Sequence, residues 1–279
     1  MLEISEGTTL SALLRLEVLD ALERRILVCH ALKLSRTQLI TRSDHVLTTN
    51  EIHTVASLFE RRLAGEPIAY ITGEREFYGL SFKVAPGVLI PRPETELLVE
   101  LAIEKAPQQA CVLDMGTGSG AIAVALVHAR PDLQVSALDQ NEAALGIAQD
   151  NAQRHQVKVH FLHSDWYQAI EDQQFDVIVS NPPYIVAGDK HLAQGDLRFE
   201  PLDALTDHAD GLSALRTIIA GAVRHLKPGG WLMMEHGYDQ AEAVRALLNE
   251  AGFAAVQSWK DLASIERVSG GQLAAGMTT

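Results

Sequence analysis

The stretch FDVIVSNPPY, residues 175–184, decides how this chain folds. Its first half is a short apolar run rich in β-branched residues, which predicts a buried strand. Two consecutive prolines neither donate to a sheet ladder nor continue a helix, so the strand has to end near Asn181. The prolines form a stiff turn whose free polar groups accept hydrogen bonds, namely the Asn181 side-chain oxygen and the carbonyls of Pro182 and Pro183. With the ring of Tyr184 beside it, this turn suits a planar NH2 group, although an ordinary proline turn with an Asn cap explains these residues equally well.

On both sides of this stretch, strand and helix signals alternate from residue 110 onward. The predicted strands are 111–115, 135–139, 157–162, 175–180, 231–235, 254–259 and 265–268. The predicted helices among them are 121–129, 141–154, 212–226 and 240–251. Repeated βαβ units imply a mostly parallel sheet of seven strands, covered by helices on both faces, which is an α/β fold.

The chain before this region has a different character. Residues 1–72 are predicted to form a small N-terminal helical bundle, with apolar residues at helical spacing over 10–27, a second helix over 32–40 and a third that starts near Thr48 and Glu51. Two roles are compatible with this domain: it recognises the substrate, or it is a purely structural cap.

Residues 73–95 contain aromatic and β-branched residues around Gly79, which predicts a hairpin-like connector. Pro91 and Pro93 stiffen its last part, which leads into a predicted helix over 97–105. The rigid loop carrying Arg92 to Thr95 is interpreted as a wall of a pocket or as a simple linker. The predicted domain boundaries are therefore 1–72, 73–95 and 96–279.

Composition limits the class of function. The chain has 279 residues, is 47% hydrophobic and carries a formal charge of -13. This length accommodates one large domain or two. The acidic balance disfavours broad binding to nucleic-acid phosphates, and it fits an enzyme with a small substrate or a basic macromolecular partner.

Cysteine and histidine spacing gives no sign of a metal site. Cys29 and Cys111 lack CxxC spacing, so we expect free thiols in a reducing cytoplasm. His160 and His163 would face opposite sides of one strand. The first residues show no signal-peptide apolar region, and no apolar run is long enough to span a bilayer.

A glycine-rich turn lies at the carboxyl end of the first predicted sheet strand, the edge where ligands bind in such folds. It consists of Gly116, Thr117, Gly118, Ser119 and Gly120. Its glycines permit a tight turn and close approach of a ligand to the backbone. The turn is not a P-loop, because no Lys-Ser/Thr comes after it, and its third glycine is misplaced for a dinucleotide site. The carboxylate just before it, at position 114, could meet a cationic group.

Three further signals lie at the ends of the next strands. Asp139 is placed to accept both hydroxyls of a ribose, although it could be an ordinary carboxylate at a strand end. Asp165 could accept from an exocyclic amine and Trp166 could cover a purine, although Trp166 could equally be a core aromatic residue. With the proline turn after Asn181, this order of features fits S-adenosyl-L-methionine better than NAD.

Eight short motifs, spread over nearly the whole chain, closely resemble those of the bacterial release factor glutamine methyltransferases. They are GEPIAY (65–70), REFY (75–78), LIPRPETE (89–96), DMGTGSG (114–120), SDW (164–166), VSNPPYI (179–185), RFEPL (198–202) and EHG (235–237). The glycine turn alone would be weak evidence for this family, and NPPY alone also fits adenine or cytosine amine methyltransferases. The proline-flanked loop at 89–96, joined to a helical front domain, is far more selective.

The resemblance implies a Rossmann-like class I methyltransferase domain and transfer of a methyl group from S-adenosyl-L-methionine to the Gln side-chain amide in the Gly-Gly-Gln loop of peptide chain release factors. It assigns the cofactor to Gly116, Thr117, Gly118, Ser119, Gly120, Asp139, Trp166 and Asn181. It assigns binding of the target amide to Asn181, Pro182, Pro183 and Tyr184, and the catalytic role to Asn181, Pro182 and Tyr184. Arg92 to Thr95 would line the cofactor pocket. A monomer that binds neither nucleic acid nor membrane is expected.

Two alternatives to this activity stay open. One is a methyltransferase acting on nucleic-acid amines, against which the acidic charge and the lack of a basic stripe argue; the other is a non-catalytic module that binds the cofactor. The chain also carries Gly270-Gly271-Gln272, the tripeptide of the expected target. We interpret it as part of a flexible glycine-rich tail, with self-methylation at Gln272 as the alternative.

Overall fold

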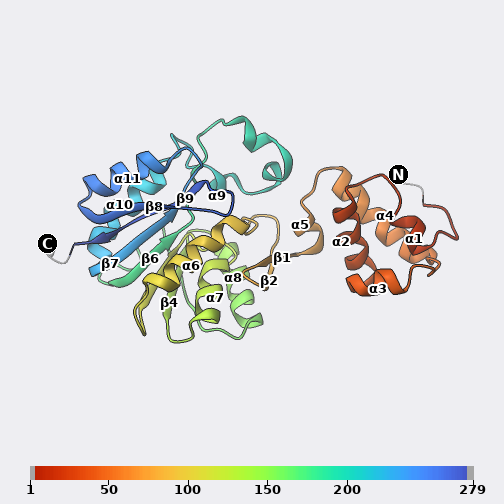
Figure 1. Ribbon diagram of the computed structural model, residues 1–279, viewed down its shortest axis with the longest axis horizontal. Helices are drawn as coiled ribbons and strands as arrows, with labels where there is room; N and C mark the ends of the chain where they lie inside the picture. Colours follow the sequence, from red (N-terminus) through yellow and green to blue (C-terminus); the bar gives the residue numbers. More distant parts are fainter. Residues whose placement is uncertain (1–3, 275–279) are drawn as a thin grey trace. The chain divides into compact units, whose positions relative to one another are not determined.

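The computed structural model describes residues 4–274 (Figure 1). They form two compact units, and the chain passes from the first to the second between Glu74 and Arg75. The helices of the first unit are α1 (Leu10–Leu13), α2 (Ala21–Leu32), α3 (Arg36–Thr41), α4 (Thr49–Leu63) and α5 (Ile68–Thr72). Their apolar faces share one core, in which Val55 and Phe59 are fully buried.

Local capping explains where two of these helices begin. The predicted helix start near Thr48 is confirmed, because the Thr48 hydroxyl and the Glu51 carboxylate form a reciprocal capping box. The predicted helix over 32–40 begins later than expected. Lys33 takes a left-handed conformation that ends α2, and Ser35 then opens α3 with a capping box of its own.

The periodic stretch over residues 10–27 is broken into two helices, contrary to the prediction of one continuous helical face. Asp20 caps α2 through backbone N–H groups of its first turn. Arg24 is buried, and its guanidinium donates to the backbone carbonyls of Leu14, Leu16 and Leu19 in the break. These bonds satisfy carbonyls that a helix would otherwise pair, which makes the break stable.

The second unit is an α/β domain, as predicted. The two-stranded sheet contains β1 (Glu74–Phe77) and β2 (Leu80–Lys83), which confirms the hairpin in the connector. The main sheet has the order β5-β4-β3-β6-β7-β9-β8. Its strands are β3 (Cys111–Met115), β4 (Gln134–Asp139), β5 (His160–His163), β6 (Phe175–Ser180), β7 (Leu226–Glu235), β8 (Phe253–Lys260) and β9 (Glu266–Leu273). The pairs from β5 to β7 are parallel and β9 is antiparallel to both its neighbours, so the seven-stranded, mostly parallel sheet is confirmed.

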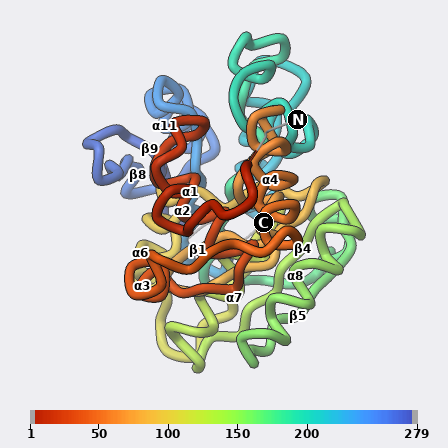
Figure 2. Tube along the Cα trace, turned by 90° about the vertical axis from the view of Figure 1, so that its right-hand side faces the viewer, coloured from red at the N-terminus to blue at the C-terminus, as the bar shows by residue number. Residues whose placement is uncertain are grey.

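Helices cover both faces of this sheet (Figure 1). They are α6 (Glu96–Lys105), α7 (Ala121–Ala129), α8 (Glu142–Arg154), α10 (Ser213–His225) and α11 (Ala241–Glu250). One core contains α6 and α7 with sheet residues such as Val112 and Val177. The other contains α10 and α11 with the alternate residues, such as Leu113 and Ile178, as the period of a strand requires. Figure 2 shows α7 and α8 beside β4 and β5 in the green part of the trace.

The segment after the proline turn was not predicted from the sequence. It contains η2 (Lys190–Ala193), η3 (Gly195–Phe199) and the short helix α9 (Leu202–Leu205), while η1 (Pro93–Thr95) precedes α6. Short 3-10 helices are too short to show a periodic spacing of apolar residues, so this spacing does not predict them.

The Gly270-Gly271-Gln272 tripeptide lies inside β9, so its interpretation as a flexible tail is wrong. Gly270 pairs with Met233 of β7 and with Gln257 of β8. A Cβ at Gly270 would lie 2.4 Å from a backbone oxygen of β7, so only glycine allows this close approach. The Gln272 Nε2 donates to the Gly229 carbonyl at 2.8 Å, which holds the side-chain amide on the domain itself.

Three observations bear on other classes of function. Within residues 4–274, no three His, Cys, Asp or Glu side chains are grouped so that they could hold a metal ion. None of the helices in this part of the chain combines the length and apolar character needed to cross a membrane. Cys29 and Cys111 are both free thiols.

Candidate active site

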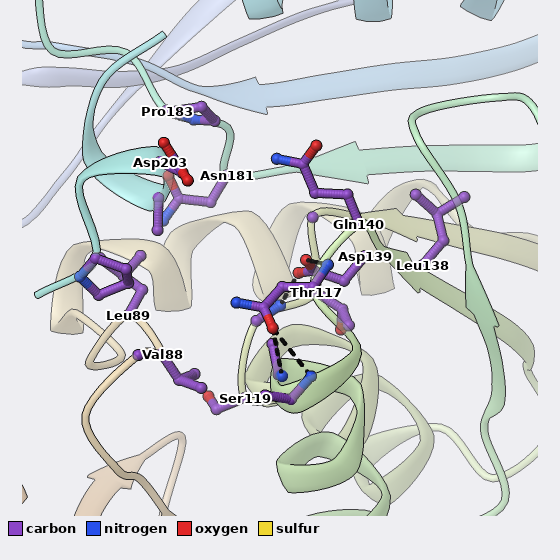
Figure 3. Close-up of a pocket in the computed structure, with 18 of the residues that line it drawn as sticks. Val88, Leu89, Thr117, Ser119, Leu138, Asp139, Gln140, Asn181, Pro183 and Asp203 are labelled. Atoms are coloured by element: carbon purple, nitrogen blue, oxygen red, sulfur yellow. Dashed lines mark hydrogen bonds between the residues drawn. The ribbon is translucent and has the colours of Figure 1, made fainter. Parts of the chain in front are cut away.

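A cavity of about 690 Å³ opens where β3, β4 and β6 end. Eight of the predicted site residues line it: Gly116, Thr117, Gly118, Ser119, Asp139, Trp166, Asn181 and Pro183. Figure 3 shows Thr117 and Ser119 on the glycine turn, near Asp139. Asn181, Pro183 and Asp203 lie together in another part of the lining (Figure 3). The predicted residues Gly120, Pro182 and Tyr184 are not part of the lining.

The glycine turn is held against the end of β4. The backbone N–H groups of Gly116 and Thr117 both donate to the Leu138 carbonyl at 2.9 Å. Gly118 has a φ of +55°, and nothing lies within 4 Å of the Cβ that a substitution would add, so its backbone faces open space. Gly120 has a different role, because a Cβ added there by substitution would lie 2.9 Å from the Ala148 side chain. The turn therefore exposes backbone at Gly118 and packs against α8 at Gly120.

A buried carboxyl group lies at the start of this turn. Asp114 is fully buried, and its Oδ2 accepts from the Thr117 hydroxyl at 2.6 Å. Its Oδ1 has no hydrogen-bond partner within the described residues. Burial raises the pKa of Asp114 to about 7, against a smaller opposing effect of the Thr117 hydroxyl. Asp114 does not itself line the cavity, but it bonds Thr117, which does, and a cationic group on that side would compensate for the burial of the carboxyl group.

Asp139 ends β4 and helps to hold the turn. Its Oδ2 accepts from the Gly118 N–H at 2.9 Å and its Oδ1 from the Asn141 N–H at 2.9 Å. Burial raises the pKa of Asp139, while these backbone bonds oppose the rise. A carboxylate offers about four acceptor positions, so Asp139 can still accept hydroxyl groups from a ligand in the cavity.

The segment after β5 presents Trp166 in a left-handed backbone conformation, with a φ of +46°. Such a conformation is costly for an aromatic residue and needs local support. Ser164 supplies it, because its Oγ donates to the Trp166 carbonyl at 2.7 Å and accepts from the Ala169 N–H at 3.0 Å. Asp165 and Trp166 both line the cavity, where a planar base could lie against the ring.

The proline corner comes directly after β6. The Ser180 hydroxyl donates to the Met115 carbonyl at 2.7 Å and joins the corner to the end of β3. The Asn181 Nδ2 donates to the Thr95 hydroxyl at 3.2 Å, and no residue in the described part of the chain bonds its Oδ1. The Tyr184 hydroxyl donates to the Glu235 Oε1 at 3.2 Å. Asn181 therefore lines the cavity with a side-chain oxygen that has no partner among the described residues.

The loop before α6 lines the cavity only in part. Of the predicted range 92–95 only Thr95 belongs to the lining, together with Pro91 before it, whereas Arg92, Pro93 and Glu94 do not. Arg92 instead pairs with Glu200, a buried carboxylate that also accepts from the Ile90 N–H at 2.9 Å. This ion pair links the loop to the segment that carries α9, so Arg92 shapes the wall of the cavity from outside.

Two buried polar residues support the site and were not assigned a role from the sequence. Glu235 at the end of β7 is 1% exposed and lies behind the proline corner. Asn151 on α8 is fully buried, and its Nδ2 donates to the carbonyls of Ser119 and Lys83. The EHG motif contained Glu235, but only the tertiary structure shows what it contacts. The sequence did not indicate a buried role for Asn151, because a polar residue in an amphipathic helix is expected to face solvent.

The glycine turn, the carboxylate after the next strand and the acceptor corner together define a methyltransferase with a class I fold. Residues 93–196 match the family described as Methyltransferase small domain, and residues 10–73 match the PrmC N-terminal domain. This fold is shared with a solved Pyrococcus furiosus methyltransferase, which is 18% identical with a TM-score of 0.56, over 78% of this chain and 99% of that one. A Thermus thermophilus 16S rRNA N2 G1207 methyltransferase, solved with AdoMet and guanosine, is 26% identical with a TM-score of 0.52, over 72% of this chain and 49% of that one.

Curated relatives are similar over almost the whole chain. The release factor glutamine methyltransferase of Burkholderia pseudomallei is 57% identical, over 95% of this chain and 96% of that one. The protein of the same name from Neisseria gonorrhoeae is 48% identical, over 93% of this chain and 96% of that one. This chain belongs to the release factor glutamine methyltransferase family. Its methyl donor is S-adenosylmethionine.

Proposed function

We propose that this chain transfers the methyl group of S-adenosylmethionine to the side-chain amide nitrogen of the Gln in the Gly-Gly-Gln loop of peptide chain release factors. The observation that carries this proposal is the Asn181 side chain, which donates to Thr95 and leaves its Oδ1 as an acceptor. An amide NH2 group needs such acceptors. The names of the curated relatives give release factor glutamine as the substrate of those proteins.

The cofactor would lie in the cavity between the glycine turn and the Trp166 segment. Asp139, which lines the cavity, would take the ribose hydroxyls, and the ammonium group would lie toward Asp114, whose unpartnered oxygen is buried behind Thr117. Trp166 would cover the purine, and Gly118 would allow the ligand to approach the backbone. When bound, the cofactor supplies a sulfonium methyl group as the electrophile.

The residues of the proline corner would orient the substrate amide. An amide nitrogen is a poor nucleophile, because its lone pair is delocalised into the carbonyl. We propose that Asn181 Oδ1 and the Pro182 carbonyl accept its two N–H groups, while Pro183 and Tyr184 pack against its plane. Positive charge that develops on the nitrogen strengthens both hydrogen bonds in the transition state. Orientation alone contributes several kcal/mol, so the site does not require a strong general base, and the nitrogen loses one proton to solvent after the methyl transfer.

The test of this function is methyl transfer by the purified protein with labelled S-adenosylmethionine. Release factor, a release factor whose Gly-Gly-Gln glutamine is replaced by Ala, duplex DNA and RNA serve as separate substrates. We expect label only on the intact release factor, and peptide mapping should place it on that Gln. Label on DNA or RNA with none on the release factor would refute the proposal and favour an amine methyltransferase of nucleic acids.

We propose in addition that the helical unit recognises the release factor and that the protein acts as a cytoplasmic monomer. Ile40 is 78% exposed on the helical unit and is apolar. Ile40→Asp should raise KM for the release factor without changing KM for the cofactor, because the cofactor cavity is built entirely from the second unit. An unchanged KM for the release factor would leave the unit with a structural role. Light scattering that gives twice the chain mass would contradict the monomer.

A further inference from the structure

A buried carboxyl group behind the proline corner has no role in the function proposed above. Glu235 ends β7 and is 1% exposed, with its Oε1 bonded to the Tyr184 hydroxyl at 3.2 Å. Its Oε2 is buried without a partner among the described residues. The Thr95 hydroxyl faces the same carboxyl group and lowers its pKa. Two hydroxyl groups around the substrate corner therefore share one acidic neighbour.

The direction of the hydrogen bonds in this group determines what the corner can do. An ionised carboxylate only accepts, so a hydroxyl group that bonds Glu235 has to point its hydrogen toward it, as the Tyr184 hydroxyl does. Thr95 has a single hydroxyl hydrogen, and once it points toward Glu235, the oxygen of Thr95 is left to accept. It accepts from the Asn181 Nδ2 at 3.2 Å. The opposite end of that amide, Oδ1, then has to face away from Thr95.

We propose that Glu235 is a positioning residue that acts through Thr95 to orient the Asn181 amide, so that its oxygen rather than its NH2 group receives the substrate. This inference rests on the proposed function of Asn181 as an acceptor for the target amide. A protonated Glu235 can donate its own hydrogen, which frees the Thr95 hydrogen to point at Asn181. The Asn181 amide can then turn by about 180°, and its NH2 group would oppose the NH2 group of the substrate.

Protonation of Glu235 falls in a pH range that can be tested. Burial raises the pKa of Glu235 to about 7, opposed by the hydroxyls of Thr95 and Tyr184 and by the charge of Arg267 on the neighbouring strand. Glu94 on the preceding loop raises it further. Since the active arrangement needs the ionised form, turnover should be highest above about pH 7 and should fall as Glu235 becomes protonated below it.

The first test compares Glu235→Gln with the wild-type protein, and Glu266→Gln serves as a control with the same chemical change in the same sheet. Glu266 lies on β9, pairs with Arg245 at 3.3 Å and does not line the cavity. We expect Glu235→Gln to lower kcat on release factor roughly tenfold, as expected for loss of one oriented hydrogen bond, with little change in the Kd of S-adenosylmethionine. The kcat of Glu235→Gln should also no longer decrease below about pH 7, whereas Glu266→Gln should keep the wild-type dependence of kcat on pH.

Two Thr95 variants test the same relay if Glu235→Gln does not fold. Thr95→Ser keeps the hydroxyl and should keep the pH profile, whereas Thr95→Val removes it and should lower kcat and flatten the profile. Wild-type kcat and pH dependence in both Glu235→Gln and Thr95→Val would overturn the proposal. A merely structural role would instead change stability or cofactor affinity and leave the pH profile of kcat intact.

A spectroscopic measurement separates this inference from the proposed function. The Asn181 side-chain amide gives a 15N–1H signal, which should shift with a midpoint near the Glu235 pKa in the wild-type protein and stay constant in Glu235→Gln. An inactive wild-type protein that shows this coupled shift would refute the proposed substrate and support the relay. Methylation of release factor by a wild-type protein whose Asn181 signal ignores pH would support the function and overturn the relay.

Discussion

Replacing Asp114 with Asn should change how the stability of the second unit depends on pH. The pKa of Asp114 is raised from 3.8 to about 7 by burial, so the folded state holds a proton that the unfolded state releases. This contribution to stability is fully present below about pH 4 and is lost as pH rises through about 7. With 1.36 kcal/mol per pKa unit, about 3 kcal/mol of it disappears between about pH 5 and about pH 8.

The assay is the free energy of unfolding in urea, measured from about pH 5 to about pH 8. Asp114→Asn cannot ionise, so its unfolding free energy should fall by about 3 kcal/mol less over this range than that of the wild-type protein. Asp172→Asn provides the control, since Asp172 is exposed and its replacement should leave the pH dependence unchanged. Equal pH dependence in Asp114→Asn and wild-type protein would show that the reasoning about this buried carboxyl group is wrong.

Three further substitutions test separate parts of the site. Asn181→Ala should reduce kcat on release factor roughly a hundredfold while sparing cofactor affinity, measured by calorimetry, and near-normal turnover would refute its role. Glu200→Gln weakens the buried pair with Arg92 and should destabilise the protein by about 3 kcal/mol in urea unfolding; a change within about 0.5 kcal/mol would contradict the link it is said to form. Gly120→Ala forces a Cβ to 2.9 Å from Ala148 and should weaken cofactor binding in calorimetry at least tenfold, whereas a wild-type Kd would show that the turn adapts.

Much of the catalytic unit was predictable because its signals are local. A short apolar run that ends in prolines, or a glycine turn after a strand, carries its structural meaning within a few residues, and β6 and β3 end as expected. Asp139 was predicted for the same reason, since a carboxylate that ends a strand of a parallel sheet lies at the ligand edge, and Asp139 does line the cavity.

The contacts that were missed join residues far apart in the sequence. Arg92 and Glu200 are separated by 108 positions, and no local pattern reports that they pair. Arg24 reads as the polar side of a helix, yet it satisfies carbonyls in the break between α1 and α2. The third predicted strand begins at His160 rather than 157, because the Val157 N–H still bonds the end of α8. In each case a tertiary contact outweighs the local preference.

The strand next to the edge of the sheet, β9, explains why an enzyme of this specificity would not act on itself. Gly270, Gly271 and Gln272 repeat the target letters, but they are held as extended backbone between β7 and β8, and the Gln272 amide is engaged by Gly229. A search by sequence alone would count this chain among its own substrates. Methylation of Gln272 would therefore require β9 to leave the sheet and the Gln272 amide to leave Gly229.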